Sequence, residues 1–449
     1  MFRRFAISFL LVFVGICAWG RTRPHYGGTL HVEIEGDPWT GPDGLVRQLV
    51  LDGLTRLGSD GAVEPALATE WLSDDSVHRW EFRLRPGVQF QDGSQLNATT
   101  VVQSLNLSCN ANCPWSAVRA VGSSVVFTAD SPMPNLPALL AEDKFLIALT
   151  VTASGATPAN VIGTGPFQFS AQNNGVLTLA ANENCWAGRP FLDSIEFHAH
   201  RTIRDQWLDL NLGRADVAEV PPEDLRQAQQ QRLAVKVSPP VELLALQVSD
   251  TGALANPMFR GSIAAAVDRS ALFNVIFQKQ GEITASLLPQ ELSGYAFIFS
   301  TDRDLNKAHA LRGGLTAPPL TLSYEGDGAL QLAAQRLALN LHEAGFDVQV
   351  VDAAHATHVD LMVRRLPIAM GPPAVALETA MRAAGEAVSV GAQSPPALFR
   401  IEREFLDHKT LVPLLDLPRA YAIGPRVRDF VLRADGRPDL ASVSLEDAP

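Results

Sequence analysis

The stretch from Val161 to Phe197 constrains the fold of this chain more than any other part of its sequence. It opens with Gly163, Gly165 and Pro166, and apolar residues then alternate with polar ones from Phe167 onwards, as in a half-buried strand. We predict a strand, a short turn, a second strand, and a corner rich in aromatic residues and glycine that leads into a third strand. We expect the glycines and the proline to start the first strand tightly, using a positive φ and the fixed φ of proline.

Length and charge narrow the class of protein. A chain of 449 residues exceeds one ordinary core, so we expect two or more compact units. The net charge is −12 and there is no run rich in lysine and arginine. Phosphate binding needs a concentrated basic surface, so we expect no nucleic acid and no anionic membrane surface as a partner.

The first twenty residues have the layout of an export signal. Two arginines precede an apolar run from Phe5 to Trp19, and Ala18 and Gly20 are small residues at a plausible cleavage site. We predict a signal peptide over residues 1–20 and a location in the periplasm or cell envelope. The apolar run is short for a membrane span, but an uncleaved anchor stays open as an alternative.

The cysteines suggest one disulfide and one free thiol. Cys17 follows Ile16 rather than a small residue, which does not favour lipidation. Cys109 and Cys113 could close a small disulfide loop in an oxidising compartment. The histidines nearest in sequence show no zinc spacing, so a metal site is the weaker interpretation. We expect Cys185 to be a buried free thiol.

No pattern predicts catalytic chemistry. The sequence contains no nucleophile elbow, zinc helix, phosphate loop or dinucleotide fingerprint with the required spacing. We therefore expect no enzyme, no catalytic residue, no metal ligand and no cofactor.

The order strand, helix, strand between Leu320 and Val351 predicts a right-handed βαβ unit and a parallel sheet.

Several motifs together resemble the bacterial extracellular solute-binding proteins of family 5, the oligopeptide, dipeptide and nickel binders of ABC importers. The family pattern after its "GTGPY" motif is matched here by Asn182, Trp186, Gly188, Pro190, Leu192, Asp193, Ile195 and Phe197. Further matches are the segment GGTLHVEIEGDP near the amino terminus, the segment from Val50 to Trp71, and the segment from Trp80 to Leu105.

The resemblance implies an α/β protein with the two-lobed periplasmic binding protein fold (type II, cluster C like) and an extra subdomain in the first lobe. On this basis we expect the first lobe over residues 21–240, with the subdomain at about 45–155. The second lobe would span residues 241–411, and residues 412–449 would return to the first lobe.

The same resemblance implies where a ligand binds. In peptide-binding members the strand after "GGTL", here His31 to Asp37, can pair its backbone with an extended peptide. The aspartate that receives the peptide ammonium is replaced here by Ala369, and two arginines nearby would favour a carboxylate or phosphate. The expected ligand-binding residues are Glu33, Ile34, Glu35, Gly36, Asp37, Trp39, Arg364, Arg365 and Leu366.

The leading hypothesis is therefore a solute-binding protein of an ABC importer. It would capture a peptide or an anionic small molecule between its lobes, deliver it to a membrane permease, and act as a monomer. The alternative is a scaffold that kept the fold, lost small-molecule binding and acts through protein interaction.

Overall fold

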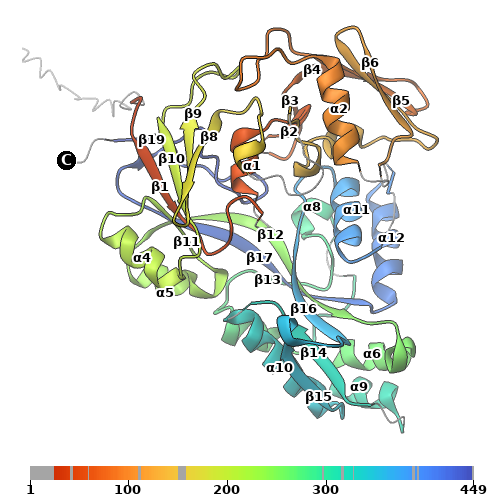
Figure 1. Ribbon diagram of the computed structural model, residues 1–449. Helices are drawn as coiled ribbons and strands as arrows, with labels where there is room; N and C mark the ends of the chain where they lie inside the picture. Colours follow the sequence, from red (N-terminus) through yellow and green to blue (C-terminus); the bar gives the residue numbers. More distant parts are fainter. Residues whose placement is uncertain are drawn as a thin grey trace, which may run out of the picture.

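The structure is a computed structural model that describes residues 25–446, except 41–43, 59, 110–112, 150–157, 296–297, 315–317, 327, 387–389 and 392–393. The predicted signal peptide lies outside the described residues. Two lobes are joined by two long strands that run through the middle of the molecule (Figure 1). This is the two-lobed α/β fold that the sequence predicted.

One large sheet passes through both lobes. Within the described residues it has 11 strands in the order β15-β14-β16-β12-β17-β11-β1-β10-β9-β8, with β13 (Glu282–Ile283) added beside β17. The strands of the first lobe are β1 (Thr29–Glu33), β8 (Phe167–Asn173), β9 (Val176–Ala181), β10 (Ser194–His198) and β11 (Val217–Glu219). In the second lobe they are β14 (Leu320–Tyr324), β15 (Val348–Asp352) and β16 (Leu361–Pro367).

The predicted run of three strands after Val161 is confirmed, as β8, β9 and β10. The structure does not confirm the positive φ that we expected for the glycines at the start of the first strand. Gly163 and Gly165 have no positive φ. They are needed because a Cβ on either would overlap backbone atoms of the segment Leu49–Val50.

The first lobe carries α1 (Leu45–Val50), α4 (Ile203–Asn211) and α5 (Leu225–Gln230). α1 packs into the same core as β1, β9 and β10. The subdomain has its own core, which begins at Leu54 and covers a four-stranded sheet. Its elements are β2 (Thr55–Leu57), β3 (Val63–Pro65), β4 (Ala68–Ser73), β5 (Arg79–Leu84), α2 (Ala98–Ser108), β6 (Ala117–Val121), β7 (Ser124–Thr128) and α3 (Leu136–Leu139).

The second lobe contains the predicted βαβ unit, because β14 and β15 pair in parallel with α10 (Ala329–Glu343) between them. Leu337 and Leu341 of α10 are fully buried against this sheet. The other helices of the lobe are α6 (Pro257–Ala266), α7 (Arg269–Ala271), α8 (Gln290–Ser293), α9 (Leu305–Arg312), α11 (Pro373–Ala383) and α12 (Pro395–Asp407).

The lobes are connected by β12 (Ala234–Val248) and β17 (Leu411–Ile423), which pair antiparallel along most of their length. The middle of this pair contains two register shifts close to Pro240. Leu415 of β17 lies in the core of the second lobe, and Tyr421 lies in the core of the first. After β17 the chain stays with the first lobe, where β18 (Val427–Arg428) pairs with β19 (Ser444–Leu445).

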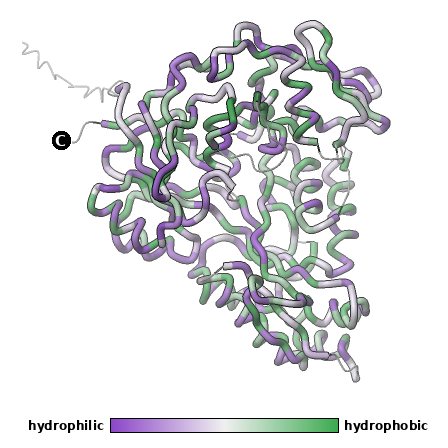
Figure 2. Tube along the Cα trace, viewed as in Figure 1, coloured by the Kyte–Doolittle hydropathy of each residue, from purple (hydrophilic) through white to green (hydrophobic). Residues whose placement is uncertain are grey.

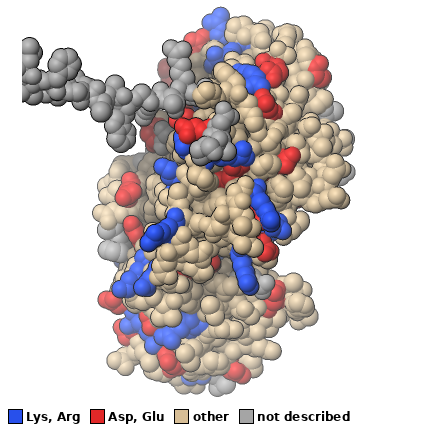
Figure 3. All heavy atoms as spheres, turned by 90° about the vertical axis from the view of Figure 1, so that its left-hand side faces the viewer, with Lys and Arg blue, Asp and Glu red and all other residues tan. Residues whose placement is uncertain are grey.

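Apolar and polar residues alternate along the elements of both lobes, and no long apolar stretch stands out in the part of the chain that the structure describes (Figure 2). Among the described residues, no helix combines the length and apolarity needed to cross a bilayer. On the face drawn in Figure 3, positive and negative side chains are interspersed.

Candidate functional site

A polar pocket lies at the carboxyl ends of β1 and β10 in the first lobe. These two strands run in parallel, so their carboxyl ends meet at one edge of the sheet, where α/β proteins commonly bind ligands. The pocket has a volume of about 350 Å³. It is lined by Glu33, Asn174, Gly175, Val176, His198, Ala199, Arg201, Asp209 and Arg214.

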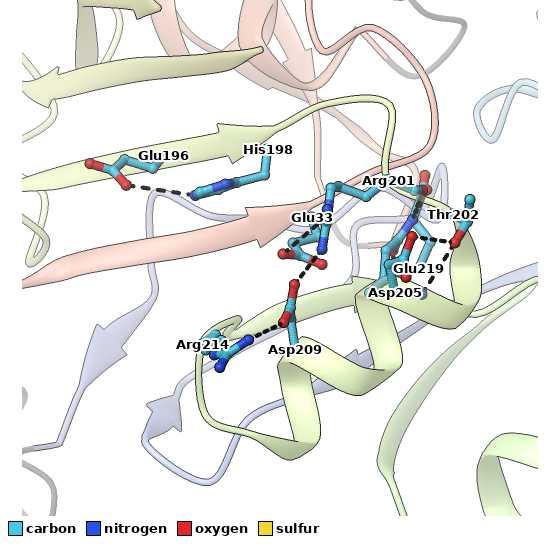
Figure 4. A network of polar contacts seen from close by, with 10 residues as sticks. Glu33, Glu196, His198, Arg201, Thr202, Asp205, Asp209, Arg214 and Glu219 are labelled. Carbon is cyan, nitrogen blue, oxygen red and sulfur yellow. Dashed lines mark hydrogen bonds and ion pairs between the residues drawn. The ribbon is translucent and has the colours of Figure 1, made fainter. Parts of the chain in front are cut away.

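Charged groups from β1, from α4 and from the residues that flank α4 form a network in this pocket (Figure 4). Arg201 Nη2 lies 2.5 Å from Asp209 Oδ2, and Arg201 Nε lies 3.7 Å from Glu33 Oε1. Arg214 Nη1 lies 3.5 Å from Asp209 Oδ1, and 70% of the Arg214 side chain is exposed. α4 is held in place by Thr202, whose hydroxyl accepts a hydrogen bond from the backbone N–H of Asp205.

Glu33 is the unusual member of this network. Only 4% of the residue is exposed, and its Oε2 has no hydrogen-bond partner among the described residues. Burial raises the pKa of Glu33 to about 7, the neighbouring Asp209 adds to the rise, and Arg201 opposes it. Glu33 can therefore change its charge near neutral pH.

A second cluster lies along the same face of the sheet. His31 and Glu33 alternate with buried Leu30 and Val32, so both point away from the core. Across the β1–β10 pair, His31 faces Glu196 and Glu33 faces His198. Nδ1 of His31 lies 3.2 Å and Nε2 of His198 lies 3.6 Å from Glu196 Oε2. Burial lowers the pKa of His198, and the nearby His31 adds to this effect.

The structure corrects the expected backbone role for β1, the first part of the predicted segment His31 to Asp37. β1 lies between β10 and β11 and is not an edge strand. The backbone N–H groups of His31, Ile34 and Glu35 donate to Asp216, His198 and Glu219 respectively. The backbone of β1 is therefore not available to pair with a peptide.

The residues after β1 have different surroundings. Glu35 and Gly36 are exposed, and Asp37 is half-buried. The Asp37 carboxylate accepts hydrogen bonds from the backbone N–H groups of Trp39 and Thr40, which lowers its pKa against the opposing effect of burial. Trp39 is buried in the core of the first lobe. A ligand-binding role for these side chains stays a prediction.

The second predicted group lies in β16, and the structure does not bring it into contact with the first. Arg364 Nη1 donates to Gln247 at 2.7 Å. Arg365 contacts Glu223 at 3.2 Å and Glu242 at 3.9 Å. Leu366 is buried in the core beneath α11 and α12. Carboxylates thus already surround Arg365, which weakens the argument that it selects an anionic ligand.

Sequence reasoning missed most of the pocket. Arg201, Asp209 and Arg214 lie in a helix and its flanks, where isolated charges are usual, and nothing in their spacing points to β1. It also missed the buried carboxyl of Glu402 on α12, which accepts hydrogen bonds from Tyr295 and from the backbone of Leu287. Burial raises the pKa of Glu402 to about 7.

The predicted cysteine states also have a place in the structure. Cys109 ends α2, and the structure pairs it with Cys113 at a Cα–Cα distance of 5.7 Å, which is in the usual range for a disulfide. Cys185 is buried and free.

Two lobes are joined by two paired strands, and a polar pocket lies at the strand ends of the first lobe. This arrangement defines the class of two-lobed periplasmic binding proteins. Residues 62–377 match the model of the bacterial extracellular solute-binding proteins, family 5 Middle. The chain belongs to this family.

Individual proteins support the same assignment. The chain is 25% identical over 338 residues to a "Probable di/tripeptide-binding protein 5" of Pseudomonas aeruginosa, a match that covers 65% of this chain and 64% of that protein. It is also 33% identical over 144 residues to the protein YhjP of Bacillus subtilis, covering 30% of this chain and 24% of that protein. The chain thus spans less than two thirds of the length of these curated relatives.

Solved structures show the same fold at low sequence identity. The murein tripeptide binding protein MppA of Escherichia coli has a TM-score of 0.81 at 16% identity, covering 94% of this chain and 99% of that chain. The binding protein AgaA of A. tumefaciens R10, solved with agropinic acid, has a TM-score of 0.79 at 20% identity with the same coverage.

Proposed function

We propose that this protein captures a small solute outside the cytoplasm and delivers it to the permease of an ABC importer. Its membership of family 5, over residues 62–377, carries the proposal. The strands β12 and β17 supply the two connections about which the lobes would close on the solute. The proposed role is binding and not catalysis, and the proposed location is the periplasm or cell envelope.

The class of solute is proposed from the pocket and from the relatives. A peptide is favoured by the Pseudomonas relative, whose name gives di- and tripeptides. The pocket contains both Glu33 and Asp209 and both Arg201 and Arg214, so it offers partners to a solute that carries charges of both signs. Arg214 has the most exposed of these charged side chains, and we expect it to contact the solute.

Native mass spectrometry of the mature protein, purified gently from its own host's envelope, tests the proposal. We expect a mass above that of the denatured chain, and release of a small molecule on denaturation. Thermal-shift screening with di- and tripeptides and with small organic anions would then identify the class. A protein that purifies empty and is stabilised by none of these solutes would contradict the proposal.

A variant links binding to the pocket. Arg214→Ala removes a mostly exposed side chain that pairs with Asp209. We expect about tenfold weaker solute binding, as for the loss of one charged contact. Arg83→Ala is the matched control, because Arg83 is 65% exposed and pairs with Glu70 in the subdomain. Equal affinities of the two variants for the solute would mean that the solute binds outside this pocket.

The scaffold alternative is favoured by a specific observation. Three of the residues expected to bind ligand are already used internally, because Trp39 and Leu366 are buried in cores and Arg365 is ion-paired. A scaffold would purify empty and show no solute-dependent stabilisation, yet it would retain a protein partner in a crosslinking experiment in the host envelope.

A further inference from the structure

Three metal-binding side chains meet on the polar face of β1 and β10. His31 comes from β1, and Glu196 and His198 come from β10. Their ligand atoms all lie within 4.8 Å of one another. This cluster does not depend on the proposed function, because it lies along the strands and is defined without a solute.

Two of the three distances between the ligand atoms are close to those of a tetrahedral zinc site. In a tetrahedral zinc site with bonds of about 2.0–2.1 Å, two ligand atoms lie about 3.3–3.5 Å apart. The two nitrogens here lie 3.2 and 3.6 Å from Glu196 Oε2. The two histidine nitrogens lie within 4.8 Å of each other, so rotation of the imidazole rings would bring all three atoms to one ion.

His198 supplies a second observation. Its Nε2 is buried, and it makes no hydrogen bond to any of the described residues. A buried polar atom without a hydrogen bond costs free energy, and the contact with Glu196 at 3.6 Å is too long to supply one. An ion between His198 and Glu196 would satisfy the nitrogen. About a third of each of the side chains of His31 and Glu196 is exposed, so an ion can reach the site from solvent.

We propose that His31, Glu196 and His198 bind a divalent first-row transition ion, with Zn²⁺ as the best fit. Two imidazoles and a carboxylate are ligands that Zn²⁺ prefers over Mg²⁺ or Ca²⁺, which favour oxygen ligands. Three protein ligands leave a fourth position for water or a solute group. Paired strands hold the ligands more rigidly than loops would. Because His198 also lines the pocket, the ion would lie next to it.

Direct metal binding tests the proposal. The protein is prepared without a polyhistidine tag, stripped of metal with EDTA and dialysed against Zn²⁺. The bound zinc per chain is then measured by inductively coupled plasma mass spectrometry. We expect one Zn²⁺ per chain. We also expect Co²⁺ to give the visible absorption of a four-coordinate nitrogen and oxygen site. No bound metal in the wild-type protein would overturn the proposal.

Variants place the ion. We expect His31→Asn combined with His198→Asn to weaken Zn²⁺ binding by at least about 100-fold, since even loss of an outer partner costs 10- to 100-fold. Glu196→Gln keeps the shape of the side chain and serves if the double variant does not fold. His358→Asn is the control. His358 is 68% exposed, and it contacts the carboxylate of Asp360 in the second lobe rather than the cluster. Equal Zn²⁺ binding by the control and the cluster variants would overturn the proposal.

Discussion

Gly163 and Gly165 show how single residues fix the contact between two segments of the first lobe. The backbone N–H of Gly165 donates to the carbonyl of Val50 at 3.0 Å, and Gln91 joins Gly163 and Val50 through its side chain. The chain before β8 therefore lies directly on the end of α1. A side chain at either glycine would have to displace backbone, which cannot rotate away.

We expect Gly163→Ala to lower the free energy of unfolding by about 3 kcal/mol, because its Cβ would overlap the carbonyl oxygen of Val50. Gly314→Ala is the control, since a Cβ there meets nothing within 4 Å and its φ is not positive. Urea denaturation measures both. A loss in Gly163→Ala no larger than that of the control would contradict the close-approach explanation.

Glu402 makes the stability of the second lobe depend on pH. Its pKa is about 7 in the folded protein, against an ordinary value of 4.5, so the folded protein keeps a proton that the unfolded chain loses. The contribution of this carboxyl is complete below about pH 4.5 and is lost as the pH rises through 7, a decline of about 3 kcal/mol.

We expect Glu402→Gln to reduce the decline of stability with pH by about the contribution of this one carboxyl. The rest of the decline would remain, because burial also raises the pKa of Glu33 and of Asp416. The measurement is urea denaturation from pH 4.5 to pH 8, followed by a spectroscopic probe in the second lobe. Glu404→Gln, at an exposed position of the same helix, should leave the slope unchanged. An unchanged slope in Glu402→Gln would refute the assignment.

At the scale of elements, local patterns could be predicted and long-range register could not. The alternation in β8 to β10 and the βαβ unit from Leu320 are local, so the sequence sufficed for them. His31 and Glu196 are far apart in sequence, and only the parallel register of β1 on β10 brings them together. The same register places β1 inside the sheet, so its residues 29–33 cannot pair with a peptide, whereas pairing by the segment that follows β1 stays a prediction.

The disulfide predicted from sequence belongs to the subdomain, where Cys109 ends α2. We expect Cys109→Ser combined with Cys113→Ser to destabilise the subdomain by about 2 kcal/mol, because a loop this short removes little entropy from the unfolded chain. Hydrogen exchange of α2 measures the loss, with amides of α10 in the second lobe as internal control. Equal protection of α2 in the variant and in the wild-type protein would argue against the bond.

At the scale of the whole molecule, the family resemblance predicted the two lobes but not what lies between them. Motifs that set the fold are turns and buried residues such as Leu192 and Phe197, and these are matched. Residues that would contact a solute are few and depend on how the lobes meet. Arg365 is an example. Its partner Glu223 lies in the short turn after β11, in the first lobe, and its partner Glu242 lies in the connecting strand β12.

Contacts between the subdomain and the second lobe lie away from the connecting strands. The side-chain amide of Asn135 donates to the carbonyl of Val390 at 3.0 Å, and Thr379 of α11 donates to Glu142 at 3.4 Å. These bonds can form only while the lobes are close together. They therefore favour the closed arrangement over an open one, and a solute that needs closure gains affinity from them.

We expect Asn135→Ala to shift the protein towards the open arrangement, because the carbonyl of Val390 can then bond to water instead. Small-angle scattering should show a larger radius of gyration without solute, and solute binding should weaken about five- to tenfold, as expected for loss of one hydrogen bond of about 1 kcal/mol. Asn274→Ala is the control, since the side chain of Asn274 donates to the carbonyl of Ser270 within its own lobe. Equal radii for the two variants would mean that other contacts hold the lobes together, and a weaker affinity with an unchanged radius would place Asn135 at the solute instead of at the closure.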